Sequence, residues 1–179
     1  MSATLIKSKI DSRYLKSINT NTKNNLYQYT SNSRVMLVFL RHFGCIFCKE
    51  ALHDLANKNK ELESMGIQIV FVHMTDNKIA DDYLEKYGMS DIPHISDPDC
   101  ILYRDFGLAK GTFSQLFGFM TWIRGAEVTL TKGQMVVAKE LGDGYQMPGI
   151  FVIKKDKIEK EFIHETASDT PDYIALARK

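Results

Sequence analysis

The sequence predicts an α/β fold in which helices flank a central mixed β-sheet. Two short runs, the uniformly apolar 35–40 and the mostly apolar 67–72, have the composition of strands that are covered on both faces. A helical pattern separates them, and a strand, helix, strand order of this kind implies a right-handed crossover between parallel strands. The polar turn 154–157 then lies between two further apolar runs, 150–153 and 158–163, which predicts an antiparallel hairpin.

Length and composition are those of one globular domain. The chain has 179 residues, of which 44% are hydrophobic and 25% are charged, so it is long enough to bury a substantial core. We expect residues 35–179 to form a single domain and residues 1–34 to form an extension that packs on its core.

Charge and hydropathy exclude several classes of partner. A formal net charge of +1 provides no concentrated basic face for nucleic acid or an anionic membrane. The apolar runs are far shorter than the roughly 20 residues that a membrane-spanning helix needs. Residues 1–9 lack the apolar core of a signal peptide. We therefore expect a cytoplasmic protein without a nucleic-acid or membrane partner; the sequence is compatible with a homodimer.

The first third of the chain contains a weak helical signal and then a polar stretch. Ile6, Ile10, Tyr14 and Ile18 recur four apart, which predicts a helix over residues 4–18. Residues 19–33 are rich in Asn, Thr, Ser and Tyr, which predicts a loop with a short strand around residues 26–29.

Two amphipathic helices follow the first two strands. The first begins after residue 45 and ends at Met65-Gly66; its buried stripe is Cys48, Ala51, Leu52, Leu55 and Leu62, and its outer face carries Lys49, Asn57, Lys58 and Lys60. The second spans residues 76–87, with Asp76 as its cap and Gly88 as its end.

The remaining elements are shorter. Residues 91–106 predict an extended piece, a turn at Asp97-Pro98 and a helix that points Ile101, Leu102 and Phe106 inward. Residues 112–123 are aromatic, which is typical of core, of a dimer contact or of a wall beside a site, and residues 135–141 fit strand or helix equally. Thr170-Pro171-Asp172 predicts a closing helix capped by Thr170, with Tyr173, Ile174 and Leu176 inward.

The most informative motif is Cys45-Ile46-Phe47-Cys48, which lies where the first buried strand ends and the following helix begins. One helical turn brings both sulfurs to the same end of the helix, close enough to form and break a disulfide. The unpaired N–H groups and the positive pole of the helix favour a thiolate there, where we expect solvent to reach it. In a cytoplasmic protein such a pair is more often catalytic than a permanent cross-link.

Two other interpretations of this pair remain open. A structural zinc site would need about four ligands, usually from a second short-spaced Cys or His pair. No such pair exists, because Cys100 is isolated and the histidines are scattered singly, at positions 42, 53, 73, 94 and 164. The pair could also be two buried structural thiols. Redox chemistry is therefore the favoured function of the pair, and we expect no metal. Cys100 is interpreted separately, as a small semi-buried residue near a turn or as a resolving or regulatory thiol.

The order of elements resembles the thioredoxin fold. Within that superfamily the chain is most similar to the AhpC/TSA family, specifically the peroxiredoxin-like proteins related to the SelL redox proteins. The resemblance spans about residues 35 to 177, and its motifs are residues 37–52 (LVFLRHFGCIFCKEAL), 96–99 (SDPD), 146–153 (QMPGIFVI) and 162–173 (FIHETASDTPDY).

This resemblance implies a thiol-disulfide cycle that needs no cofactor. The resemblance implies that Cys45 is the exposed attacking thiolate and that Cys48 is the resolving thiol. Pro148 matches the proline that is cis in thioredoxins, and the backbone of Met147 would pair with an extended substrate. The implied partners are a thiol, disulfide or peroxide substrate and an unidentified thiol reductant.

Departures from the family patterns keep two alternatives open. True peroxiredoxins have a Thr-x-x-Cys motif whose Thr falls at Cys45, so Cys48 would attack peroxide, oxidise to a sulfenic acid and be resolved by Cys45. Peroxiredoxins also place an arginine near Pro148, where this chain has the proline, so disulfide exchange ranks above peroxidase chemistry. A third hypothesis is a non-enzymatic binding or redox-sensing module that uses the aromatic segment around Trp122.

Overall fold

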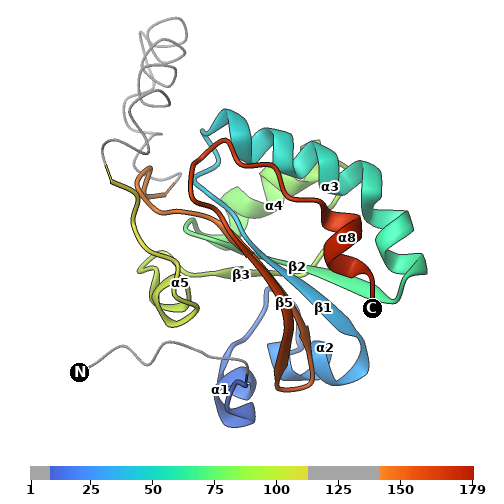
Figure 1. The fold of residues 1–179 in the computed structure, drawn as a ribbon. Helices are drawn as coiled ribbons and strands as arrows, with labels where there is room; N and C mark the ends of the chain where they lie inside the picture. Colours follow the sequence, from blue (N-terminus) through green and yellow to red (C-terminus); the bar gives the residue numbers. More distant parts are fainter. Residues whose placement is uncertain (1–8, 113–141) are drawn as a thin grey trace, which may run out of the picture.

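A five-stranded mixed sheet forms the centre of the protein (Figure 1). The computed structural model describes residues 9–112 and 142–179. The strand order is β3-β2-β1-β4-β5, and the strands are β1 (Arg34–Phe39), β2 (Ile67–His73), β3 (His94–Ser96), β4 (Gly149–Lys154) and β5 (Lys157–Ile163).

Strand β1 joins a parallel half of the sheet to an antiparallel half. It pairs in parallel with β2, which pairs in parallel with β3. On its other side β1 pairs antiparallel with β4, and β4 continues into the antiparallel hairpin with β5. The predicted parallel crossover and the predicted hairpin are both confirmed. The carboxyl ends of β1, β2 and β3 therefore meet at one edge of the sheet, where open α/β folds carry their sites.

Six described helices cover the two faces of the sheet (Figure 1). They are α1 (Ser12–Ser17), α2 (Leu26–Asn32), α3 (Ile46–Ser64), α4 (Asn77–Lys86), α5 (Ile101–Asp105) and α8 (Tyr173–Ala177). Successive residues of a strand point to opposite faces, so β1 contributes Met36 and Val38 to a core with α3, α4 and α8. Val35, Leu37 and Phe39 enter a second core with α1, α2 and α5.

The N-terminal helices differ from the sequence-based expectation. Of the helix predicted over residues 4–18, the described part is α1, which begins after its cap Asp11. Residues 26–29 were expected as a strand, which is wrong: α2 begins there because Asn25 and Gln28 form a reciprocal capping box. Leu15 and Leu26 are fully buried in the second core, while the division into an extension 1–34 and a domain 35–179 stays a prediction.

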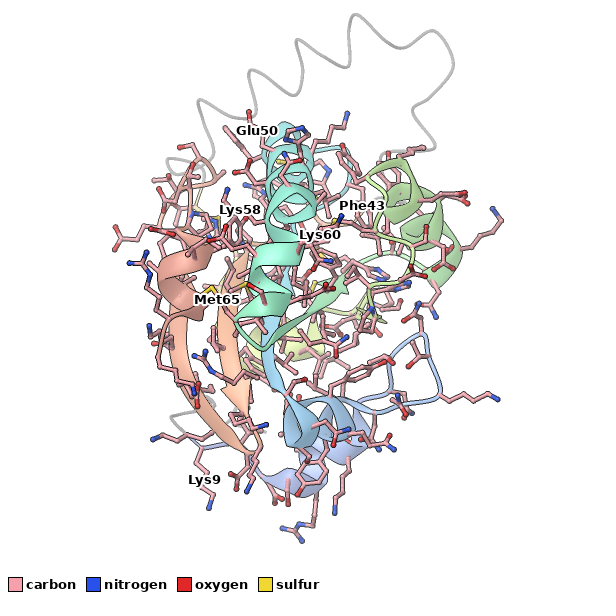
Figure 2. The ribbon with its side chains drawn as sticks, turned by 90° about the vertical axis from the view of Figure 1, so that its right-hand side faces the viewer. Lys9, Phe43, Glu50, Lys58, Lys60 and Met65 are labelled. Atoms are coloured by element: carbon pink, nitrogen blue, oxygen red, sulfur yellow. The ribbon has the colours of Figure 1, made fainter. Side chains whose placement is uncertain are left out.

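The helices around the candidate site largely follow the predicted pattern. Helix α3 buries Leu52, Leu55 and Leu62, and Figure 2 shows it with Glu50 near its start and Met65 at its end. Lys58 was expected to face outward; its ammonium group lies 5.8 Å from the ring of Tyr173, so its chain is half-buried against α8. Asp76 caps α4 as predicted, by accepting the N–H of Ile79.

Two predicted details of the shorter helices are wrong. Ile101 is 48% exposed, whereas Leu102 and Phe106 are buried as expected. The closing helix is capped by Asp172, which accepts the N–H of Ala175, and it therefore begins two residues later than a Thr170 cap would require. The segments predicted at 112–123 and 135–141 fall almost wholly outside the described residues.

Candidate active site

The cysteine pair lies in the turn that connects β1 to α3. The N–H of Cys45 donates to the carbonyl of His42 at 3.0 Å, which closes a tight turn through Gly44. Cys45 is the N-cap of α3, in an extended conformation, and its carbonyl accepts the N–H of Lys49. Cys48 is therefore the third residue of the helix, and both thiols sit at its positive end, as the spacing predicted.

Both thiols are buried, which corrects the expectation of an exposed attacking sulfur. Cys45 has no exposed surface and Cys48 is 3% exposed. They belong to the core that α3, α4 and α8 form on the sheet, together with Leu40, Phe43 and Met147. The sequence pattern could not reveal this, because the covering residues come from distant parts of the chain. Both cysteines are present as thiols.

The surroundings make Cys45 the more acidic of the two thiols. Burial raises the pKa of Cys45, but the charge of Arg41 and the backbone N–H groups of Cys48 and Phe47 oppose that rise. As a thiol, Cys45 makes no capping hydrogen bond, so these N–H groups become strong partners only for the thiolate. Burial raises the pKa of Cys48 far more, and a negative charge on Cys45 raises it further.

Arg41 is the positive charge with the largest effect on the pKa of both thiols, and the sequence analysis gave it no role. It is 2% exposed and donates a hydrogen bond from Nη2 to the carbonyl of Gly144. This contact ties the turn before Cys45 to the segment that leads into β4. His42 lies against the same segment: burial, and then the charge of Arg41, lower its pKa to about 4.

Met147 belongs to the same buried core as the two cysteines, and Pro148 lines a cavity together with Cys48. No described peptide bond is cis, so the Met147–Pro148 bond is trans, unlike the thioredoxin proline that Pro148 was matched to. The N–H of Met147 donates to the carbonyl of Ala109 at 3.2 Å, and its carbonyl accepts from Gln146 Nε2 at 3.2 Å. If the N–H of Met147 is to pair with an extended substrate, its bond to Ala109 has to be displaced, and this pairing stays a prediction.

A cavity of about 230 Å³ opens next to Cys48. Its apolar wall comes from the carboxyl ends of β1 and the start of β4, and its polar groups come from the motif turn, from α3 and from the segment between β5 and α8. The residues that carry this description are Val38, Leu40, Arg41, Cys48, Glu50, Asp54, Pro148, Ile150, His164, Asp169 and Tyr173. Cys45 does not line it.

His164 and Asp169 bring a titratable pair to this cavity. Both line it, from the segment that follows β5. Nδ1 of His164 is buried and has no hydrogen-bond partner among the residues that the structure describes. Asp169 is held by its own loop, where its carboxylate accepts the N–H groups of Glu165 and Thr166 at 2.7 and 2.9 Å. Sequence reasoning saw a resemblance here but assigned neither residue a role.

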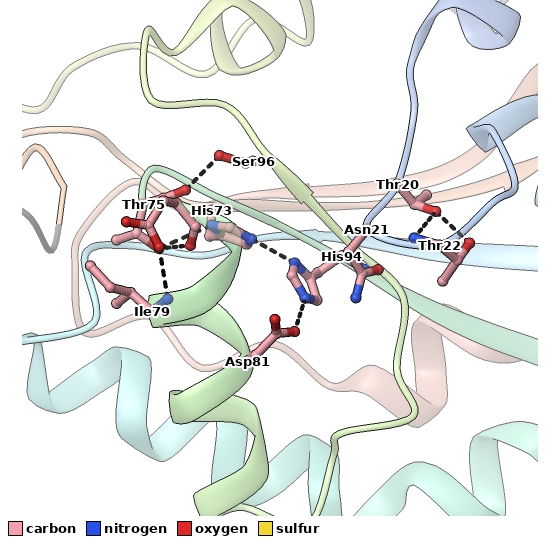
Figure 3. A network of polar contacts seen from close by, with 10 residues as sticks. Thr20, Asn21, Thr22, His73, Thr75, Ile79, Asp81, His94 and Ser96 are labelled. Carbon is pink, nitrogen blue, oxygen red and sulfur yellow. Dashed lines mark hydrogen bonds and ion pairs between the residues drawn. The ribbon is translucent and has the colours of Figure 1, made fainter.

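Two buried histidines, His73 and His94, form a series of polar contacts that ends at the exposed Asp81 (Figure 3). His73 Nε2 lies 2.8 Å from His94 Nδ1, and His94 Nε2 lies 2.8 Å from the Asp81 carboxylate. Thr75 Oγ1 contacts the other nitrogen of His73 at 3.2 Å. The ring of Phe43 packs on His73 with centroids 5.9 Å apart, so the turn before Cys45 contacts one of these histidines.

Cys100 is remote from the pair and serves as the N-cap residue of α5. It is buried, with a left-handed backbone (φ 53°), and burial raises its pKa to about 11. Cys100 occupies the N-cap position, but its side chain makes no capping hydrogen bond. The carboxylate of Asp97 accepts the N–H groups of Ile101 and Leu102 in its place. These features match the expected small semi-buried residue at a turn.

Within residues 9–112 and 142–179, no cluster of three or more His, Cys, Asp or Glu side chains could hold a metal ion. In the same part of the chain, none of the helices has the length and apolar character needed to cross a bilayer.

Comparison with known proteins gives consistent results. Residues 12–161 match the model of the AhpC/TSA family. The chain is 24% identical over 143 residues to the prostamide/prostaglandin F synthase of Salmo salar, which covers 79% of this chain and 70% of that protein. It is 22% identical to the chloroplastic thioredoxin-like protein AAED1 of Arabidopsis thaliana over 71% of this chain, but it spans only 46% of that relative's length.

Solved structures establish the fold. The reduced Prx3 of Vibrio vulnificus, in complex with hydrogen peroxide, superposes with a TM-score of 0.64 over 99% of this chain and 95% of that one, at 14% identity. The likeness confirms the thioredoxin-like arrangement that the sequence predicted.

Proposed function

This chain belongs to the AhpC/TSA family of peroxiredoxin-like oxidoreductases, and from that premise we propose that it is a thiol-disulfide oxidoreductase in which Cys45 attacks and Cys48 resolves. The observation that carries the proposal is the placement of two thiols at the start of α3, one as its cap and one a turn further in. Disulfide exchange needs an attacking thiolate and a second thiol within reach of the mixed disulfide.

The difference between the two thiols supports this assignment of roles. Cys45 has Arg41 and two backbone N–H groups to stabilise its thiolate, so it is the thiol that ionises first. Cys48 is held as a thiol by burial and, until Cys45 has reacted, also by the negative charge of the Cys45 thiolate. Electrons would then pass from a thiol reductant to the pair and from the pair to a protein or small-molecule disulfide. Pro148, which shares the cavity with Cys48, is the expected substrate contact.

A thiol-dependent peroxidase is the second candidate, and one observation favours it. Cys48, and not Cys45, lines the cavity, together with Arg41 and Pro148. A hydroperoxide in this cavity would meet Cys48 first, oxidise it to a sulfenic acid and leave Cys45 to close the disulfide. The Vibrio vulnificus Prx3, which has a similar fold, has been solved in complex with hydrogen peroxide, so peroxide is a second substrate to test.

Single-cysteine variants separate the two schemes. Cys45→Ser and Cys48→Ser proteins are mixed with a small disulfide or with a hydroperoxide, and the adducts are identified by mass spectrometry. Disulfide exchange predicts a mixed disulfide on Cys45 in the Cys48→Ser protein. Peroxidase chemistry predicts a sulfenic acid on Cys48 in the Cys45→Ser protein. If neither variant loses turnover, a binding or redox-sensing module becomes the better account.

The remaining expectations also belong to this proposal. A reducing compartment such as the cytoplasm would keep both cysteines as thiols between turnovers. A homodimer stays a prediction. A role for the aromatic segment around Trp122 also stays a prediction, because that segment lies outside the described residues.

A further inference from the structure

Cys48 needs a proton acceptor if it is to resolve a mixed disulfide. Only a thiolate attacks a disulfide sulfur, and burial holds the pKa of Cys48 far above neutrality. Arg41 opposes that rise, but the effect of burial is the larger one. A thiol in this position ionises rapidly at neutral pH only when a neighbouring base takes its proton during the attack.

The cavity that Cys48 lines contains one histidine, His164. Its Nδ1 is buried without a hydrogen-bond partner among the described residues, and an unsatisfied buried nitrogen of this kind is rare in folded proteins. Burial lowers the pKa of His164, so the ring is neutral at pH 7 and has a nitrogen available as an acceptor. The ring is held in place by an edge-on contact with Phe162, with centroids 4.9 Å apart.

The charges that face His164 suit transient protonation. The carboxylate of Asp169 and the backbones of Pro148 and Asp169 raise its pKa, whereas Arg41 lowers it. Glu50 and Asp54 of α3 and Tyr173 of α8 also line the cavity. An imidazolium formed here would be stabilised mainly by Asp169, whose own pKa is lowered by hydrogen bonds from the Thr166 side chain and backbone.

We propose that His164 accepts the proton of Cys48 across this cavity during resolution, and that Asp169 positions the ring and stabilises the imidazolium. The inference rests on the proposed disulfide exchange. First, the Cys45 thiolate attacks a disulfide RSSR, forming the mixed disulfide and releasing RS⁻, which takes a proton from solvent. His164 then takes the proton from Cys48, and the thiolate attacks the Cys45 sulfur. The intramolecular disulfide forms, the bond from Cys45 to the SR group breaks, and the leaving RS⁻ takes the proton from His164.

The two steps can be measured separately with 2-hydroxyethyl disulfide, a small neutral substrate. In the Cys48→Ser protein, mass spectrometry follows formation of the mixed disulfide on Cys45. In the otherwise unchanged protein, rapid quenching follows its disappearance. His164→Gln should leave formation unchanged and slow resolution roughly 100-fold at pH 7, the lower end of general-base catalysis. His53→Gln, an exposed position on α3, is the matched control and should change neither rate.

The pH profile distinguishes a proton acceptor from a packing residue. Resolution in the unaltered protein should rise with pH and level off near the His164 pKa, below its ordinary value of 6.5. In the His164→Gln protein the rate should keep rising into the alkaline range. Asp169→Asn should move the profile to lower pH. If His164→Gln is poorly folded by circular dichroism, His164→Ala with added imidazole decides, since a base can be restored in this way and lost packing cannot.

The possible results lead to different conclusions. The role of His164 is overturned if the His164→Gln protein resolves the mixed disulfide at the unaltered rate and with the unaltered pH profile. It is also overturned if imidazole does not rescue a slow His164→Ala protein. Either result leaves disulfide exchange standing. Absence of any mixed disulfide on Cys45 in the Cys48→Ser protein would overturn the proposed function, and the inference with it.

Discussion

The ring of Phe43 stacks on the ring of Tyr83, with centroids 4.7 Å apart and planes inclined by 19°. Phe43 lies two residues before Cys45, and Tyr83 belongs to α4, so this contact fixes the motif turn to the helix that covers the same face of the sheet. Phe43 is 1% exposed and also packs on His73. The position of the cysteine pair therefore depends on an aromatic contact between elements that are distant in sequence.

A double-mutant cycle tests this contact. Phe43→Leu and Tyr83→Leu should each destabilise the protein, and the two effects should be coupled by about 1 kcal/mol, the usual value of an aromatic pair beyond its buried area. Urea unfolding of the two single variants and the double variant gives the coupling. Additive effects would show that the stacking contributes nothing beyond separate burial of each ring.

Arg41 should set the reactivity of Cys45. Because its charge lowers the pKa of Cys45, Arg41→Met should shift that pKa upward and slow alkylation at neutral pH, where less thiolate is present. Iodoacetamide modification is followed across pH in a Cys48→Ser, Cys100→Ser background. Arg13→Met, at an exposed position in α1, is the control. An unchanged pH midpoint in the Arg41 variant would contradict the electrostatic role.

The protein should lose stability in mild acid, because two histidines, His42 and His73, have lowered pKa values in the folded state. Burial lowers the folded-state pKa of His42 to about 4 and that of His73 to about 3, below the ordinary value of 6.5. The unfolded chain therefore binds more protons between those values, and stability falls as pH falls from about 6.5 toward 4, by up to roughly 1.4 kcal/mol per pH unit for each proton. Above pH 7 these two groups should contribute no further change.

In His42→Gln, the number of protons taken up on unfolding in this pH range should fall by about one, so the unfolding free energy should depend less steeply on pH. Urea unfolding between pH 4.5 and 7 gives the slope, and His53→Gln, on the outer surface of α3, should retain the slope of the unaltered protein. Identical slopes for His42→Gln and the unaltered protein would contradict a partly buried, neutral His42 in the folded state.

Asp97 should be the main anchor of α5. It is 6% exposed, and its carboxylate accepts N–H groups from Ile101, Leu102 and Tyr103. Asp97→Ala leaves these donors without an acceptor and should cost about 2 kcal/mol of unfolding free energy, the upper part of the range for a helix cap. Asp99→Ala, at an exposed position in the same turn, should cost little. Equal losses in the two variants would contradict the capping role.

Prediction from the sequence succeeded where a hydrophobic pattern extends over many consecutive residues. The apolar runs of β1 and β2 and the amphipathic pattern of α3 each extend over enough residues to identify the element and its buried face. It failed at α2, where the reciprocal contact of Asn25 and Gln28 starts a helix in a stretch whose Asn, Thr, Ser and Tyr content predicted a loop with a short strand. It also chose Thr170 over Asp172 as a cap, because both residues suit that position and only the path of the chain decides between them.

The site was predicted in its chemistry but not in its setting. The spacing of Cys45 and Cys48 placed both sulfurs at the start of a helix, yet their burial depends on residues such as Phe43 and Met147, which the fold brings together from both halves of the chain. His164 lies more than a hundred residues after Cys48, and no periodicity connects them. A lone histidine in a polar tail carries no signal until the fold places it on the same cavity.

The depth of the cysteine pair has a consequence for the behaviour of the protein among other oxidants. An exposed sulfur can react with any oxidant that collides with it, whereas Cys48 can be reached by molecules small enough to enter a space of about 230 Å³. Cys45 has no exposed surface and does not line that space, so it can be reached only when the turn around it opens. Shape, and not reactivity alone, would then decide which compounds exchange electrons with this protein.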